Sequence, residues 1–133
     1  MRITLAADSE IPIYQQIRDQ IVTAIATGEL TAETPLPSTR QLGADLAVNF
    51  HTVNKAYDLL RREGFIRVNR KSGAVIRRDR ASGPPDPGIT DAWQERLAVM
   101  LAEAVAHGLD RDEVLARTAR MLDAFTTAER TNP

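Results

Sequence analysis

The chain has 133 residues, of which 43% are apolar, and its formal net charge at pH 7 is −1. This length fits one compact domain with a small appendage, and this apolar content excludes a disordered chain. There is no cysteine, no apolar run reaches the roughly 18 residues of a membrane span, and the N-terminus lacks a signal-peptide pattern. We therefore expect a cytoplasmic protein with no membrane contact.

The charge is unevenly placed along the chain. Residues 1–80 hold 12 Lys and Arg against 9 Asp and Glu, whereas residues 81–133 hold 5 against 9. The strongest local excess lies in residues 61–80, with eight basic and two acidic side chains. This run fits either a nucleic-acid contact or a solvated hairpin, and charge alone does not decide between them.

A first helix is predicted from residues 9–12, where a proline falls in the first turn, to about Thr27, with Gly28 ending it. Its apolar residues recur every four positions and form a stripe that can cover the following helices. They are Ile13, Ile17, Ile21 and Ile25.

Residues 38–64 predict a helix, a tight turn and a second helix. Ser38 suits an N-cap, with Gln41 completing a capping box, and this helix is expected to stop near Ala47. Asn49 suits the next N-cap and Gly64 the residue after the second helix. The second helix has a buried stripe at helical spacing, formed by Val53, Ala56, Tyr57 and Leu60.

The opposite face of this second helix carries side chains that can contact DNA. His51 and Asn54 are expected to face base edges, and Phe50 can meet a thymine methyl group. Lys55 and Arg62 are expected to meet phosphates.

A hairpin is predicted after Gly64, from β-favouring segments at 65–68 and 74–78. Its tip is Arg70, Lys71, Ser72 and Gly73, where Gly73 permits a positive φ and a close approach to a ligand or simply closes the turn.

Residues 81–90 are predicted to be a linker because three prolines and two glycines fall within them. Residues 91–133 are predicted to be two helices joined near Gly108, with Asp110 and Glu113 resembling a capping box. A two-helix hairpin cannot bury both apolar faces alone, so either the first domain or, preferably, a second copy covers them. The residues assigned to this dimerisation surface are Trp93, Leu97, Met100, Leu101, Val105, Val114, Met121, Leu122 and Phe125.

Catalytic and metal-binding patterns are missing from the sequence. The two histidines, His51 and His107, lie far apart, and no phosphate loop, nucleophile elbow or carboxylate pair is present. We expect no enzyme activity, no metal and no cofactor.

Five motifs occur in an order and spacing that resemble the winged-helix DNA-binding domain of GntR-family transcription regulators. They are Pro-Ile-Tyr-Gln-Gln-Ile at 12–17, Gly-Glu-Leu at 28–30, Leu-Pro-Ser-Thr-Arg at 36–40, Thr-Val-Asn-Lys-Ala-Tyr at 52–57 and Glu-Gly-Phe-Ile at 63–66. The short helical remainder is similar to the YtrA-like subfamily. Two positions depart from the family pattern: Glu33 stands where glycine is usual, and Phe50-His51 where the subfamily commonly has Pro-Asn.

The resemblance implies a mainly α fold with a small β wing: a winged helix-turn-helix domain in residues 1–80, the linker, and a dimerising helix pair. It implies that Arg40 contacts DNA and that the hairpin tip lies against the DNA backbone or minor groove. The residues assigned to DNA binding are Ser38, Thr39, Arg40, Asn49, Phe50, His51, Thr52, Asn54, Lys55, Arg62, Arg70, Lys71, Ser72 and Gly73.

The leading hypothesis is therefore a homodimeric transcription regulator, expected to be a repressor, that binds a two-fold related double-stranded DNA operator. Three alternatives stay open: a winged-helix protein-interaction module, a regulator with an effector at the dimer interface, and the regulatory part of a larger enzyme. The sequence does not identify an operator, the regulated genes or an effector.

Overall fold

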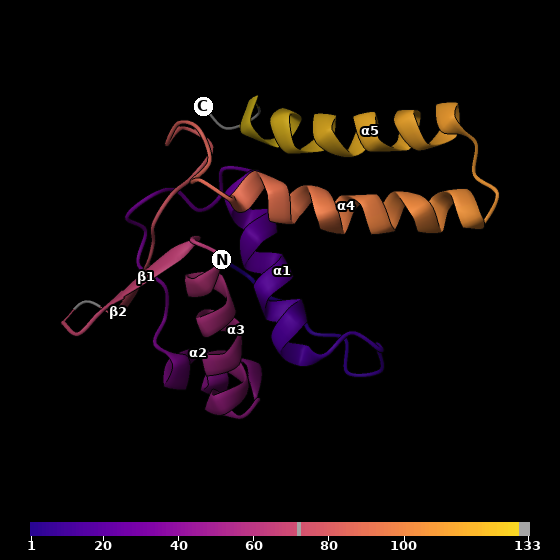
Figure 1. The fold of residues 1–133 in the computed structure, drawn as a ribbon. Helices are drawn as coiled ribbons and strands as arrows, with labels where there is room; N and C mark the ends of the chain where they lie inside the picture. Colours follow the sequence, from indigo (N-terminus) through magenta and orange to yellow (C-terminus); the bar gives the residue numbers. More distant parts are fainter. Residues whose placement is uncertain (72, 131–133) are drawn as a thin grey trace. The chain divides into compact units, whose positions relative to one another are not determined.

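The computed structural model describes residues 1–71 and 73–130 (Figure 1). Its elements are α1 (Ile13–Ala26), α2 (Thr39–Leu46), α3 (Phe50–Arg62), β1 (Ile66–Asn69), β2 (Gly73–Ile76), α4 (Ile89–Ala106) and α5 (Arg111–Arg130). The fold is mainly helical with one two-stranded antiparallel sheet, which confirms the predicted fold class. Internal contacts divide the chain into two compact units, Met1–Ser82 and a second that starts at Gly83.

None of the helices in the described ranges is long and apolar enough to cross a membrane.

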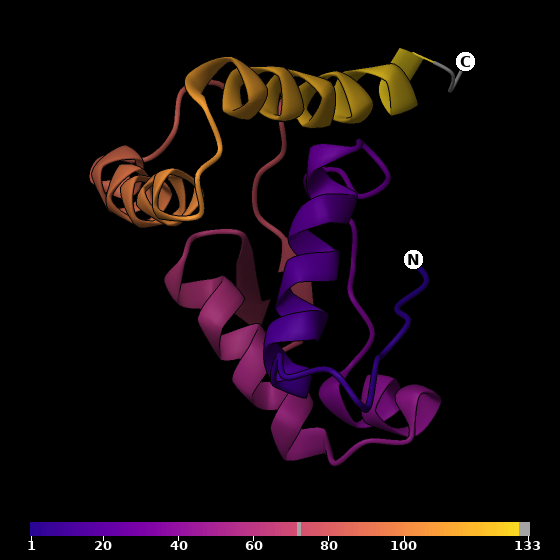
Figure 2. The ribbon, with the colours of Figure 1, turned by 90° about the vertical axis from the view of Figure 1, so that its right-hand side faces the viewer.

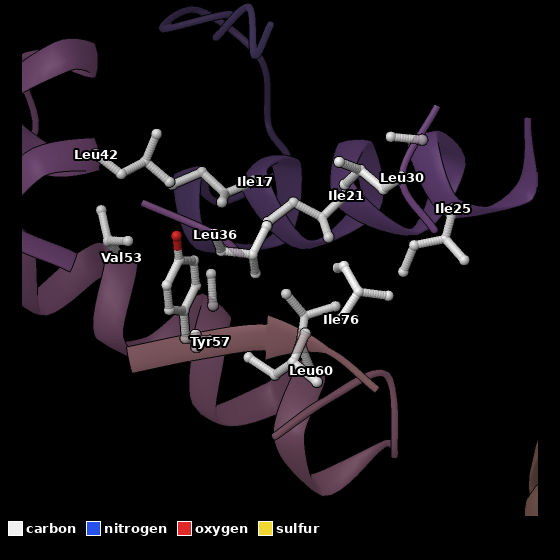
Figure 3. Packing of buried hydrophobic residues seen from close by; sticks show 14 residues of the cluster. Ile17, Ile21, Ile25, Leu30, Leu36, Leu42, Val53, Tyr57, Leu60 and Ile76 are labelled. Atoms are coloured by element: carbon white, nitrogen blue, oxygen red, sulfur yellow. The ribbon is translucent and has the colours of Figure 1, made fainter. Parts of the chain in front are cut away.

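The core of the first unit lies between α1, α3 and the sheet. Figure 3 shows Ile17, Ile21 and Ile25 of α1 facing Tyr57 and Leu60 of α3. The four-residue spacing predicted for α1 thus places its isoleucines on the buried face. Helix α3 packs against both α1 and α2, and the hairpin follows α3 (Figures 1 and 2). This core belongs to the compact unit Met1–Ser82 and joins the helices to the hairpin.

The segment before α1 is held by two glutamines that the sequence analysis did not single out. The Gln16 side chain accepts a hydrogen bond from the backbone N–H of Ala6 (2.8 Å) and donates to its carbonyl (3.0 Å). Gln20 makes the same pair of bonds with Thr4, at 2.9 and 2.7 Å. Residues two apart on an extended segment present their backbone groups to the same side, so glutamines one helical turn apart meet both.

The first helix begins later than the sequence predicted. Pro12 is the N-cap and α1 starts at Ile13, because Ser9 closes a local turn with its hydroxyl bonded to the N–H of Ile11 (3.1 Å). The residue before a proline disfavours the α region, and Pro12 itself has a non-helical ψ of 147°, so the helix begins only at Ile13.

The turn between α1 and α2 runs beside the hairpin. The backbone N–H groups of Glu33 and Leu36 donate to the carbonyls of Ile76 (2.8 Å) and Ala74 (2.9 Å) on β2. Glu33 adopts a positive φ of 73°, a left-handed conformation that glycine takes without strain. Its carboxylate is bonded to Arg67 of β1, which lowers the pKa of Glu33. At this departure from the family pattern, Glu33 therefore takes a backbone conformation that favours glycine.

In each of the two predicted capping boxes, only one of the two expected hydrogen bonds forms. The Ser38 hydroxyl accepts from the N–H of Gln41 (3.1 Å), and the Asp110 carboxylate from the N–H of Glu113 (2.8 Å). The reciprocal bonds are replaced, because the Gln41 side chain donates to Asp45 (2.7 Å) and the Glu113 carboxylate accepts from Arg117 (2.6 Å). A partner four residues ahead on the same face competes with the N-cap backbone.

The second unit is a helix pair with little interior of its own. Helix α4 begins at Ile89, inside the segment predicted as linker, and none of its 18 residues is buried. Most of the residues assigned to the dimerisation surface are exposed: Trp93 51%, Met100 65%, Leu101 40%, Val105 71%, Met121 64% and Leu122 59%. Leu97, Val114 and Phe125 are only partly covered. The sequence analysis missed further exposed apolar residues in this unit, among them Ile89, Val99, Leu109 and Leu115.

Candidate nucleic-acid interface

Helices α2 and α3 form a helix-turn-helix whose connection, residues 47–49, is very short. Ala47 takes the turn with a left-handed φ of 57°, and the Asn49 side chain accepts from the N–H of His51 (2.9 Å) to start α3. Gly43 permits the close packing, because a Cβ there would lie 3.0 Å from the carbonyl oxygen of Val48. The predicted caps at Ser38 and Asn49 and the stop near Ala47 are confirmed.

Three predicted site residues meet at the start of the second helix. The guanidinium carbon of Arg40 lies 4.2 Å from the centroid of the Phe50 ring, and that ring lies 4.1 Å from the His51 imidazole. Arg40 and His51 are exposed, whereas Phe50 is half-buried. The cation therefore rests on an aromatic face, with its N–H donors available.

A second cation on this side also rests on an aromatic ring. The Nζ of Lys55 on α3 lies 4.1 Å from the centroid of Tyr14 in the first turn of α1. Within the described ranges no carboxylate pairs with Arg40 or Lys55. Their charges are available to an anionic partner.

Arg62 differs from these two cations. Its Nε lies 3.1 Å from the Asp58 carboxylate, which also accepts from Arg61 at 2.7 Å. The hydrogen bond from Arg61, with the charges of both arginines, lowers the pKa of Asp58. Arg62 is therefore partly neutralised within its own helix, a pairing that the sequence prediction of a phosphate contact did not include.

An open groove of about 470 Å³ runs between the start of α2, the exposed side of α3 and the hairpin. It brings together four predicted DNA-binding residues, Ser38, Thr39, Asn54 and Gly73. Arg61 also lines this groove and was missed, although its seven-residue spacing from Asn54 places both on one helical face.

Tyr57 lines this groove and connects its two helices. Its hydroxyl donates to the backbone carbonyl of Pro37 across 2.7 Å and so connects α3 to the residue before the Ser38 cap. Burial raises the pKa of the Tyr57 hydroxyl, which therefore stays protonated as a donor.

The predicted wing is present as β1 and β2, paired in register from Ile66↔Ile76 to Asn69↔Gly73. Arg70, Lys71 and Gly73 are exposed at its tip, and Gly73 has a φ of 70° with open space around it. Ser72 lies outside the described residues. Thr52, the remaining predicted contact, is half-buried at the start of α3. No cluster of potential metal ligands occurs in the part of the chain that the structure describes.

Helix α3, capped and exposed on one side, together with the adjoining basic hairpin, defines a winged helix-turn-helix of the DNA-binding class. The family model described as bacterial regulatory proteins, gntR family, matches residues 13–76. The chain belongs to the GntR family of transcription regulators, and its similarity to YtrA proteins supports the YtrA-like subfamily.

Two proteins named YtrA match most of this chain. The transcriptional repressor YtrA of Bacillus subtilis is 31% identical over 106 residues, which cover 80% of this chain and 81% of that protein. The structure of YtrA from Sulfolobus acidocaldarius is 41% identical, with a TM-score of 0.62, and covers 78% of this chain and 97% of its own.

Other similarities have either a lower sequence identity or a smaller coverage of the relative. A Listeria monocytogenes structure described as a transcriptional antiterminator has a TM-score of 0.83 over 94% of this chain and 92% of its own, at 23% identity, and shows the fold alone. The rhizopine catabolism regulator MocR of Rhizobium meliloti is 34% identical over 84 residues, which are 63% of this chain and 16% of that protein. The chain spans 31% of the length of two further relatives.

Proposed function

We propose that this protein is a sequence-specific transcriptional repressor that binds a two-fold related DNA operator as a homodimer. The observation that carries the proposal is the exposed side of α3 and its surroundings, where Arg40 and Lys55 carry unpaired positive charge beside the polar side chains of His51 and Asn54. Cations supply phosphate contacts and amide or guanidinium groups supply base contacts, so this surface has both components of recognition.

The capping residues keep donors for phosphate. Ser38 uses its oxygen as the acceptor for the Gln41 N–H, which leaves the hydroxyl hydrogen free to donate. Asn49 likewise accepts through Oδ1, which leaves its NH₂ group as a donor. These residues lie at two helix N-termini, where the helix dipole also favours an anion.

The homodimer is proposed from the second unit. Helix α4 has no buried residue, and apolar side chains such as Met100 and Leu122 are mostly exposed. Covering this surface with a second copy stabilises it by roughly 25 cal/mol per Å² of apolar area removed from water. Two linked half-site readers then match a two-fold operator, and linkage can raise affinity on the order of 10²–10⁴-fold.

Repression is proposed by similarity, because the YtrA relative from Bacillus subtilis is described as a repressor. Bound dimers would block polymerase by occupying DNA near a promoter. A reporter placed behind an operator that the protein has selected from a random DNA library should be expressed less when the protein is present, and increased expression would contradict this part of the proposal.

The dimer is tested by placing charge on the exposed apolar side of the tail. Met100→Glu combined with Leu122→Glu should give a monomer by sedimentation and lose tight binding to a duplex with two half-sites, while keeping weak binding to one. Ala106→Glu combined with Ala116→Glu adds the same two charges at exposed positions on the opposite faces of α4 and α5, and this matched control should stay dimeric. A wild-type chain that sediments as a monomer while binding tightly would refute the dimer.

A further inference from the structure

Arg40 and Phe50 are in contact although they come from different helices. Arg40 lies in the first turn of α2 and Phe50 is the first residue of α3, yet the guanidinium carbon is 4.2 Å from the ring centroid. The half-buried ring has a fixed backbone, because Asn49 caps the helix immediately before it. Contact with this ring therefore restricts the Arg40 side chain, which would otherwise populate many rotamers.

Another arginine in the same domain shows what is particular about this contact. Arg18 lies farther from its aromatic neighbour, 5.9 Å from the Phe65 centroid, and donates to Glu63 (2.9 and 3.0 Å) and Asp19 (2.9 Å). The N–H groups of Arg18 are therefore engaged in hydrogen bonds within the protein. Arg40 is exposed and has no carboxylate partner among the described residues, so the ring is the contact that positions it and its donors stay available to a ligand.

We propose that Phe50 is a specificity-determining residue that positions Arg40, so that the two side chains read neighbouring base pairs as one unit: a guanine through Arg40 and a thymine methyl group through Phe50. This inference rests on the proposed function. Arginine pairs with O6 and N7 of guanine, and an apolar side chain contacts the thymine methyl. Successive base pairs are about 3.4 Å apart, close to the distance between the guanidinium and the ring.

The contact also explains how an exposed arginine can discriminate well. A flexible side chain loses rotamer freedom when it binds, and a resting place on an aromatic ring removes part of that cost before binding. An exposed cation–π contact corresponds to about a twofold to fivefold effect. The proposed half-site therefore contains a thymine next to the guanine that Arg40 reads.

The test begins with a duplex selected from a random DNA library by the full-length protein. Each guanine is replaced in turn by 7-deazaguanine, which lacks the N7 acceptor, and the affinities of wild type and Arg40→Ala are measured. The guanine that Arg40 reads is the one whose replacement lowers the affinity of wild type but not that of Arg40→Ala. Each thymine is then replaced by deoxyuridine, which lacks only the methyl group. We expect one thymine beside that guanine at which deoxyuridine lowers wild-type affinity by about fourfold per half-site.

Two variants connect this methyl effect to Phe50. Phe50→Ala should bind the thymine and deoxyuridine duplexes equally, and Phe50→Leu should lower discrimination at the guanine by about twofold to fivefold. Phe65→Leu is the matched control, because it changes the other arginine-facing ring and should keep the full methyl effect even if it destabilises the fold. Melting curves of each variant separate folding from recognition.

Two results overturn the inference while leaving the proposed function intact: a specific operator with no methyl effect beside the Arg40 guanine, or a methyl effect that persists in Phe50→Ala. If the selection enriches no sequence, the proposed function fails and the inference fails with it.

Discussion

Tyr57→Phe removes one oxygen atom and leaves the ring in the core. The Tyr57 side chain is 5% exposed, and its hydroxyl makes a 2.7 Å hydrogen bond to the carbonyl of Pro37. The phenylalanine ring fits the same space, so neither a cavity nor a clash is created. The effect of the substitution therefore isolates this hydrogen bond.

The expected loss follows from that single bond. A neutral buried hydrogen bond contributes about 0.5–1.5 kcal/mol net, and the Pro37 carbonyl also loses its partner. We expect the free energy of unfolding to fall by about 1 kcal/mol, which lowers the Tm of a domain of this size by about 4–8 °C. Thermal and denaturant unfolding of the full-length chain, followed by circular dichroism, measure both quantities.

Tyr14→Phe is the matched control for this experiment. Tyr14 is half-buried, and within the described ranges its hydroxyl has no protein hydrogen-bond partner, so stability should change by less than about 0.5 kcal/mol. The ring under Lys55 is retained. Equal losses in the two variants, or no loss in Tyr57→Phe, would refute the claim that this hydroxyl fixes the start of α2 against α3.

Three further outcomes are expected. Ala47→Gly should stabilise the protein by up to about 1 kcal/mol in denaturant unfolding, because relief of the left-handed strain exceeds the added freedom of the unfolded chain; a destabilised variant would contradict this. Lys55→Ala should reduce the salt slope of DNA binding by about one, whereas Arg62→Ala should reduce it less because Asp58 already pairs with Arg62; equal slopes would contradict the difference. The hydrogen bond from the N–H of Ala32 is the first cause that lowers the pKa of Asp79 in the folded protein. The stability contributed by this carboxylate is therefore present above its ordinary pKa of 3.8 and is lost as the pH falls through the folded value. Asp79→Asn should reduce the loss of stability at acid pH, and an unchanged acid dependence would contradict this.

Local signals in the sequence were sufficient for most of the reading elements. The caps at Ser38 and Asn49, the stop at Gly64 and the presence of a hairpin after it depend on neighbouring residues, and they occur as predicted. The isoleucine spacing of α1 likewise placed its buried face correctly. These features follow from backbone chemistry within one or two turns.

Features that depend on competition or on distant partners could not be predicted. Gln41 had two partners within reach, and the carboxylate of Asp45 on the same helical face is the one it bonds. The bonds of Gln16 to Ala6 require an extended segment folded back along α1, which no local pattern indicates. The contact of Arg40 with Phe50 likewise needs the packed geometry of two helices. The four-residue spacing of Asp58 and Arg62 does favour their pairing, which competes with the phosphate contact predicted for Arg62.

The central claim, specific DNA recognition by the helix-turn-helix, is tested most directly by comparing two arginine variants. Wild type, Arg40→Ala and Arg96→Ala are titrated with the selected operator and with a scrambled duplex at one fixed salt concentration. Arg96 is an exposed arginine of α4 and controls for loss of one positive charge. We expect wild type and Arg96→Ala to prefer the operator equally, and Arg40→Ala to lose about 1–3 kcal/mol of that preference. Equal binding of wild type to both duplexes, or an Arg40→Ala variant indistinguishable from Arg96→Ala, would contradict the account.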